Sequence, residues 1–324
     1  MPRLYIGVDG GGTNCRIRLA DADLRTLAES KQGRANLQID AGDPGYRAIL
    51  DGTRACFEAA SIDYAETAGT YACFGMAGGR LESSRKAFGQ RDWPFAGVRV
   101  HDDIDIAHAG ALGGEDGAVI IAGTGSAALA MVRGQRHQAG GWGFFIGDQM
   151  SGAILGRELI RYAVEARDGL VEASPLTDAV IARLGGSNDA VMDWSFGAAQ
   201  GLQIVDAEGR DETDDPALAA TLNRFSIGRG PAEYGDRAIL DLLFAHYEQG
   251  DPVAKAMMDI QFVHIDRYVA WFKARGATIM AVVGGLADRL FPLLRERYGD
   301  FVVERRGEPL DGALILARQQ FANA

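Results

Sequence analysis

Cysteine is scarce in this sequence, and the few that occur suggest neither a disulfide framework nor a cluster. The chain has 3 cysteines, Cys15, Cys56 and Cys73, an odd number without paired or metal-ligand spacing. They are expected to be reduced thiols in a cytoplasmic protein. The 5 histidines are scattered along the chain, so they indicate no metal cluster either.

Long apolar runs and an excess of basic residues are also missing. The longest uncharged run, residues 117–132, is shorter than the roughly 20 apolar residues of a spanning helix. No basic segment followed by an apolar one precedes the first expected strand, so no signal peptide is expected, and the acidic surface that repels anionic lipid disfavours a membrane partner. Lys and Arg total 33 against 44 Asp and Glu, a net charge of -11 that disfavours nucleic acid as a partner.

The rest of the composition fits a well-packed protein. With 324 residues and 47% apolar residues, the chain suffices for one large or two ordinary domains. Strand-like and helix-like segments alternate, which indicates the α/β class. The polar stretch 203–230 is expected to be a surface insertion without function. Strands are expected at residues 4–8, 15–21, 70–79, 97–103, 117–123, 127–132 and 277–285, and helices at 44–60, 104–112, 151–167, 252–274, 286–298 and 310–321.

Two glycine-rich turns stand out, each between two expected strands. The first is Asp9 with Gly10, Gly11, Gly12, Thr13 and Asn14, and the second is Gly123, Thr124, Gly125 and Ser126. Glycine permits positive φ and close approach to backbone N–H groups, which can form an anion-binding concavity. Each turn alone can also be a plain tight hairpin. Because the two match, we expect two related domains whose turns clamp one triphosphate from both sides.

Other phosphate-binding patterns fit less well. The P-loop with its lysine is absent. The stretch GTGSAA matches the permissive dinucleotide fingerprint, but a strand is expected after it where that fingerprint needs a helix. Asp9 stands at the strand end beside the first turn, where it can hold Mg²⁺ through water, although it can also be a turn-capping acid.

These turns, with the later VVGG turn, resemble the actin-like, sugar-kinase and hsp70 ATPase superfamily. Within it the chain resembles the BadF/BadG/BcrA/BcrD group, most closely its N-acetylglucosamine and glucosamine kinases, from Asp9 to about Ala317. The segments IAGTGS and GGWGFFIGDQMSG are the most specific pieces. The resemblance implies two actin-like (ribonuclease H-like) domains with an interdomain cleft, ATP and Mg²⁺ as cofactors, and a homodimer as in many relatives. The small domain would span residues 1–116 with a C-terminal helix at about 309–324, and the large one 117–308.

The resemblance also implies a catalytic acid about twenty residues before the GTGS turn, at a strand end that leads into a helix. Asp103 fits best, with Asp102 and Asp105 as close competitors. Such an acid accepts the proton of the attacking sugar hydroxyl. One of the three acids can instead cap the helix.

The implied sugar pocket comes from several short segments. An amide at Asn36 would bond sugar hydroxyls, which must be satisfied when they leave water. Trp142 would offer an apolar face, or be an ordinary core aromatic. Gln149 stands where the family often has an acid, which leaves the charge of this pocket open. The implied substrate-binding set is Asn36, Ala77, Gly78, Asp103, Gly141, Trp142, Gly143 and Asp148, and the implied adenosine turn, which can also be a plain strand-to-helix turn, contains Gly284 and Gly285.

The resemblance therefore predicts an ATP-dependent kinase that converts N-acetyl-D-glucosamine to its 6-phosphate, with sugar binding closing the cleft. The alternatives are a glucosamine kinase, an ATPase activator of a radical dehydratase, and an actin-like nucleotide-binding scaffold without kinase activity. The activator would need cysteines for an iron–sulfur cluster, and the three separated cysteines argue against it.

Overall fold

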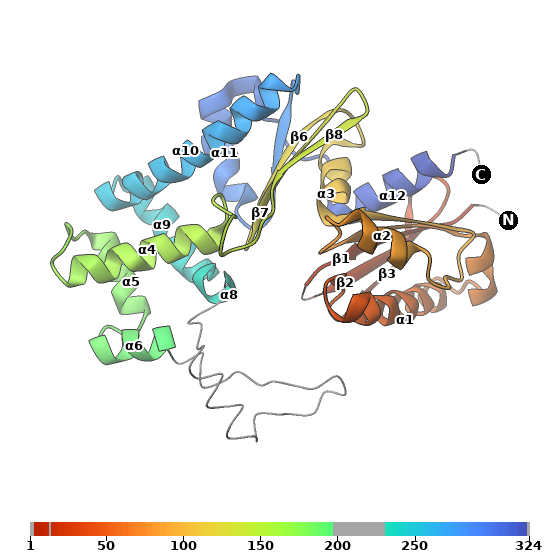
Figure 1. Ribbon diagram of the computed structural model, residues 1–324, viewed down its shortest axis with the longest axis horizontal. Helices are drawn as coiled ribbons and strands as arrows, with labels where there is room; N and C mark the ends of the chain where they lie inside the picture. Colours follow the sequence, from red (N-terminus) through yellow and green to blue (C-terminus); the bar gives the residue numbers. More distant parts are fainter. Residues whose placement is uncertain (1–2, 13, 197–230, 323–324) are drawn as a thin grey trace.

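The computed structural model describes residues 3–12, 14–196 and 231–322, and Figure 1 shows them as two lobes. Each lobe contains one mixed β-sheet with helices packed against it, so the predicted α/β class is confirmed. Thr13 and the polar stretch 203–230 lie outside the described residues. Among the described helices, none is both long enough and apolar enough to cross a membrane.

The first sheet has the strand order β3-β2-β1-β4-β5. β1 pairs antiparallel with β2 and parallel with β4, and β4 pairs parallel with β5. The strands are β1 (Tyr5–Gly10), β2 (Cys15–Ala20), β3 (Thr26–Gln32), β4 (Tyr71–Met76) and β5 (Gly97–Asp102).

The second sheet has the order β8-β7-β6-β9 and repeats this pairing. β6 is antiparallel to β7 and parallel to β9, as β1 is to β2 and β4. The repeat inferred from the two glycine turns thus extends to a four-stranded unit, and both turns occupy the same place in it. The strands are β6 (Gly117–Ala122), β7 (Ser126–Val132), β8 (Gln135–Gly140) and β9 (Met280–Val283).

Helices pack against both sheets and make up much of the second lobe (Figure 1). With the first sheet lie η1 (Asp40–Gly42), α1 (Asp43–Ala59), η2 (Tyr64–Gly69), α2 (Glu82–Gly89), α3 (Asp103–Leu112) and α12 (Pro309–Gln320). With the second lie α4 (Gly152–Arg167), α5 (Pro175–Arg183), α6 (Asn188–Phe196), α8 (Pro231–Tyr234), α9 (Arg237–Glu248), α10 (Pro252–Ala274), α11 (Ala287–Tyr298) and η5 (Gly299–Phe301).

α3 contributes to the cores of both lobes. Ile104, Ala107 and Leu112 are buried in a cluster with residues of β6, β7 and β9. Ile106 is fully buried in another cluster, with residues of β1, β4 and α12. Because apolar burial on both sides fixes this helix, its N-terminal end has a defined position relative to both sheets.

α12 returns the chain to the first sheet and crosses α3 at two glycines. A Cβ at Gly312 would lie 1.9 Å from the carbonyl oxygen of Ile106, and one at Gly110 would lie 2.0 Å from that of Glu308. Only glycine allows the two backbones to approach this closely. We propose that α12 belongs with residues 1–116 to one domain, and that residues 117–308 form the other.

Replacing Gly312 with alanine is therefore expected to destabilise the protein. The added methyl group meets backbone atoms that cannot move independently, so the free energy of unfolding should fall by about 3 kcal/mol. Gly69→Ala is the matched control, because a Cβ there has nothing within 4 Å. Urea denaturation of both variants checks this, and equal midpoints would contradict the close crossing.

Candidate active site

Three acids gather where β5 passes into α3. Asp102 precedes the helix, and Asp105 returns to it in a capping box, with the Asp102 N–H donating to Asp105 Oδ2 at 3.2 Å. Asp102 and Asp105 thereby satisfy backbone groups that a helix start leaves unpaired. Asp103 lies between them as the first residue of α3.

Strand β8 of the second sheet supplies partners for the two capping acids. Arg136 Nε donates to Asp105 Oδ1 at 2.6 Å, and its Nη2 lies 3.5 Å from Asp102 Oδ2. Gln138 Nε2 donates to Asp102 Oδ2 at 3.1 Å. Among the described residues no cation forms an ion pair with Asp103, so this carboxylate differs from its two neighbours.

The surroundings of Asp103 favour its protonated form. Burial, and then the charge of Asp102, raise the pKa of Asp103 from 3.8 to about 7, and the charge of Asp9 adds to this. Burial also raises the pKa of Asp102. Burial alone would raise the pKa of Asp105 too, but His101 and Arg136 hold it below its ordinary value. A carboxyl group whose pKa lies near neutrality suits proton transfer.

The GTGS turn is closed by backbone hydrogen bonds. Gly123 N–H donates to Gly125 O at 3.0 Å, and Gly152 N–H donates to Gly123 O at 2.7 Å. None of the described glycines of the two turns has a left-handed φ, so conformational freedom is not what these turns require of glycine. Close packing explains two of them, since a Cβ at Gly10 would lie 2.7 Å from the Met76 sulfur and one at Gly125 would lie 3.1 Å from Asp148 Oδ2, whereas a Cβ at Gly12 would have nothing within 4 Å.

Asp148 packs against the GTGS turn. It has a left-handed backbone with φ of 61°, its side chain is buried, and the backbone of Ser126 and Gly143 favours the charged form of its carboxylate. Burial raises the pKa of Asp148. The Ser126 hydroxyl accepts from Met150 N–H at 3.2 Å, so it also holds the loop together.

A cavity of about 380 Å³ opens beside these groups. Its lining brings together many of the residues predicted for the site. The lining residues are Gly78, Arg80, Asp102, Asp103, Ile104, Ile121, Gly123, Thr124, Gly125, Ser126, Ala127, Gln138, Gly141, Gly143 and Asp148. Asn36, Ala77, Trp142 and the described residues of the first glycine turn do not line it.

Trp142 stands outside this cavity with 61% of its surface exposed. The guanidinium of Arg80 lies 3.7 Å from the centre of its ring. Arg80 also donates to the carbonyl oxygens of Gly140 and Gly141, the latter at 3.2 Å. It is the one Arg or Lys among the described cavity residues, and sequence reasoning missed it because a single arginine after a glycine turn carries no pattern.

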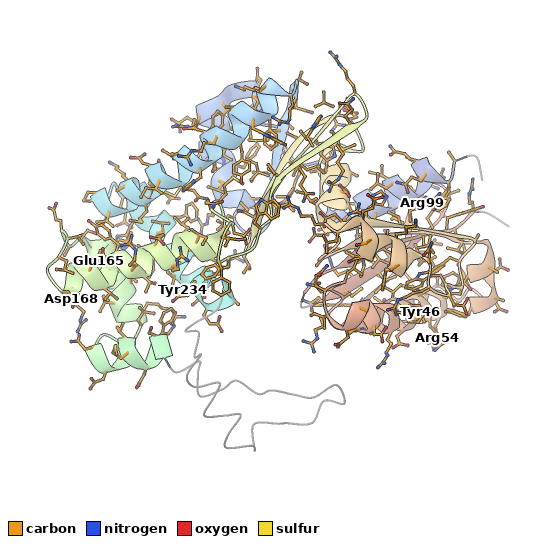
Figure 2. All side chains as sticks on the ribbon, viewed as in Figure 1. Tyr46, Arg54, Arg99, Glu165, Asp168 and Tyr234 are labelled. Atoms are coloured by element: carbon orange, nitrogen blue, oxygen red, sulfur yellow. The ribbon has the colours of Figure 1, made fainter. Side chains whose placement is uncertain are left out.

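The loop between β8 and α4 is anchored on the second lobe. Phe144 stacks on Tyr234 of α8, which Figure 2 labels, with 5.8 Å between ring centroids. Phe145 and Ile146 beside it are more than 70% exposed. The loop therefore presents apolar side chains next to Trp142.

Asn36 is partly engaged in its own loop. Its Oδ1 accepts from the N–H of Gln38 at 2.8 Å, and Gln38 Nε2 donates to Gly78 O at 2.9 Å. Asn36 also forms a β-bridge with Ala77, so the two predicted segments lie side by side. Among the described residues its amide nitrogen forms no hydrogen bond, which leaves that group for a ligand.

A second cavity of about 180 Å³ lies on the other side of the GTGS turn. Of the two glycines predicted for the adenosine turn, Gly285 lines this cavity and Gly284 does not. Gly284 has a φ of 98°, and a Cβ there would lie 2.6 Å from Ala122 O, so glycine is required. Gly123 and Thr124 line both cavities. The sequence did not predict the contribution of α9 to this lining. The other lining residues are Gly235, Arg237, Leu240, Asp241, Phe244, Gly285, Leu286, Asp288 and Arg289.

Asp9 forms an ion pair that the sequence did not reveal. Arg16 Nη2 lies 2.9 Å from Asp9 Oδ2, and its Nη1 lies 2.9 Å from Glu308 Oε2. The second carboxylate oxygen of Asp9 forms no hydrogen bond within the described part of the chain, which suits a ligand role. Among the described residues no three acids, histidines or cysteines are grouped to hold a metal ion. The free carboxylate oxygen of Asp9 is of the type that Mg²⁺ prefers.

The three cysteines do not take part in this chemistry. All are buried and unbridged. Burial raises the pKa of Cys15 to about 12 and raises those of Cys56 and Cys73 as well. Such thiols are inert packing groups.

Comparison with known proteins gives relatives for the whole chain. It is 27% identical over 313 residues to the glucosamine kinase of Vibrio cholerae, covering 97% of this chain and 95% of the relative. A structure from Chromobacterium violaceum, provisionally named an N-acetylglucosamine kinase, is 28% identical with a TM-score of 0.75, covering 98% and 99% of the two chains.

A more distant structure extends the likeness in fold alone. The glucokinase of Streptomyces griseus, solved with glucose and AMPPNP, is 18% identical with a TM-score of 0.52 and covers 98% of this chain and 99% of its own. The family model for BadF/BadG/BcrA/BcrD ATPases matches residues 6–225. The resemblance drawn from the glycine turns is thus confirmed, and this chain belongs to the BadF/BadG/BcrA/BcrD ATPase family.

Proposed function

We propose that this protein is an ATP-dependent kinase that phosphorylates the 6-hydroxyl group of an amino sugar. One observation carries the proposal: the GTGS turn separates two cavities, and Gly123 and Thr124 line both of them. Asp103 lines one cavity, and Gly285 and residues of α9 line the other. A phosphoryl group bound at the turn would lie between a sugar on one side and a nucleoside on the other.

Asp103 acts as the base in this proposal. Its carboxylate accepts the proton of the sugar hydroxyl as that oxygen attacks the γ-phosphorus, and ADP leaves with the bonding electrons. Arg80, the cation in the same cavity, offsets charge on the transferred group. The hydrogen bonds of Asn36 and the loop of Gly141 to Gly143 would orient the sugar once the lobes approach each other.

The first glycine turn approaches the phosphates from the opposite lobe. The charge of Asp9 raises the pKa of Asp103, so the two carboxylates are within electrostatic reach. Closure of the lobes around α3 would bring Gly10, Gly11 and Gly12 to the phosphates and exclude water. Asp9 would hold Mg²⁺ through water, and such an ion would supply positive charge beside the phosphates.

The charge of the cavity favours a free amino group on the sugar. Asp102, Asp103 and Asp148 line it, and although Arg136 pairs with Asp102, neither Asp103 nor Asp148 has an ion pair among the described residues. Arg80 is the single cation in the lining. The indole of Trp142, which would suit an acetyl group, lies outside it and is exposed. We therefore rank D-glucosamine first and N-acetyl-D-glucosamine second. The two relatives do not decide between these sugars, because the V. cholerae protein is named for glucosamine and the C. violaceum protein for N-acetylglucosamine.

The substrate is tested by ADP release across a panel of hexoses and hexosamines. The value of kcat/KM should be at least tenfold higher for D-glucosamine than for N-acetyl-D-glucosamine, and lowest for glucose. The reverse order would assign the acetylated sugar. ADP release that no hexosamine stimulates would rule out the kinase.

Asp103→Asn should remove the base while leaving the nucleotide site in place. We expect kcat to fall about 10³-fold, with the Kd for ATP within twofold of wild type. Isothermal calorimetry with a non-hydrolysable analogue measures the latter. Loss of nucleotide binding would mean that Asp103 is structural.

The same variant has a pH-dependent effect on stability. Because folding raises the pKa of Asp103 to about 7, the folded state binds more protons than the unfolded state between pH 3.8 and 7. The contribution of Asp103 to the free energy of unfolding of the wild type is therefore lost as the pH rises through 7. The amide of the Asp103→Asn variant cannot ionise, so the Tm of this variant relative to wild type should be higher at pH 8 than at pH 5. No change in that difference would contradict the raised pKa.

Thr124→Ala should weaken nucleotide binding because the side chain borders both cavities. The Kd for ATP is expected to rise about tenfold, the loss of one hydrogen bond to a charged group. Thr26→Ala, on the exposed strand β3, is the control. Equal affinities in the two variants would remove the turn from the phosphate site.

A further inference from the structure

Strand β8 reaches from the second sheet to the acids at the start of α3. Arg136 and Gln138 are two residues apart, so on a strand they point to the same side. Their contacts end on Asp102 and Asp105, the two acids on either side of Asp103. Resting on the proposed kinase function, we propose that Arg136, assisted by Gln138, is a positioning residue that holds Asp103 in its catalytic orientation.

The geometry makes Arg136 a clamp across the capping box. Its Nε donates to Asp105 Oδ1 at 2.6 Å, while its Nη2 lies 3.5 Å from Asp102 Oδ2. Both carboxylates also bond the backbone at the start of α3. One guanidinium thus contacts the N-cap residue before Asp103 and the N3 residue two positions after it, which limits how the first turn of the helix can move.

Charge gives the clamp a second effect. Four carboxylates face this region, and the charges of Asp102 and Asp9 both act on Asp103. The cations that pair with them are Arg16 at Asp9, Arg136 at Asp102 and Asp105, and, when protonated, His101, whose Nδ1 lies 3.7 Å from Asp105 Oδ2. Without Arg136 the like charges would repel, and the acids would hold protons to higher pH.

The clamp also ties the base to the phosphate turn. β8 pairs antiparallel with β7, with Ala127 opposite Gly140 and Met131 opposite Arg136. β7 begins at Ser126, the last residue of the GTGS turn. The strand that holds the acids is therefore hydrogen-bonded to the strand that leaves the turn, so Arg136 sets where Asp103 lies relative to the transferred phosphoryl group.

The test compares Arg136→Gln with Arg133→Gln, which alters an exposed arginine of the same hairpin that forms no ion pair within the described residues. In the full-length protein, Arg136→Gln should lower kcat about tenfold, with the KM for ATP within twofold. Arg136→Lys should restore part of the loss, because it keeps the charge but not both contacts. Arg133→Gln should match wild type.

The pH profile of kcat/KM separates positioning from mere stability. Removal of the Arg136 cation should move the acid limb to higher pH. Asp102→Asn, which keeps a helix-capping side chain, should move it to lower pH because one charge beside Asp103 is lost. A purely structural role would lower the rate without moving the limb in either direction.

The outcomes distinguish the two proposals. Wild-type protein without hexosamine-dependent kinase activity would overturn both. An active wild type with Arg136→Gln equal to Arg133→Gln in kcat and in pH profile would overturn the clamp alone. If Arg136→Gln unfolds, Gln138→Ala, which removes one hydrogen bond to Asp102, should still lower kcat several-fold, and an unchanged kcat there would count against the clamp.

Discussion

The apolar packing of α3 between the two sheets is the interaction on which the rest of the structure depends. Ile104 and Ala107 are buried in the second lobe's cluster and Ile106 in the first lobe's. Because α3 packs on both sides, the lobes can approach each other only by a rotation that keeps both of these cores closed. The acids at its N-terminal end therefore stay between the glycine turns of the two repeated units.

Three acids lie where that helix begins, and the surrounding residues compensate the charges of two of them. Asp102 and Asp105 receive a guanidinium and an amide from β8, and both serve the helix cap. Asp103 receives no such cation within the described residues, and its pKa is raised. The fold thus neutralises the structural acids and leaves the one between them able to exchange a proton near neutral pH, at some cost in stability.

Much of this arrangement could be predicted from the sequence. Apolar runs that end in glycine marked β1, β4, β6 and β9, and the matched turns indicated the repeat. β3 and β8 were missed because their residues, such as Lys31 and Arg136, are largely polar and leave no apolar period. The residues of α9 at the second cavity were missed because only the fold brings them to the Gly285 turn. The roles of Arg80 and Arg16 depend on contacts across the structure, which spacing along one chain does not encode.

The crossing of α3 and α12 at Gly110 and Gly312 also bears on how the protein is made. The first sheet is built from the early part of the chain, yet the helix that covers β1 and β4 follows all of the second lobe in sequence. During synthesis on the ribosome, that face of the early lobe stays uncovered until α12 emerges. The two lobes therefore cannot complete their folding one after the other along the chain. The first lobe can complete its core only after the C-terminal helix has been synthesised.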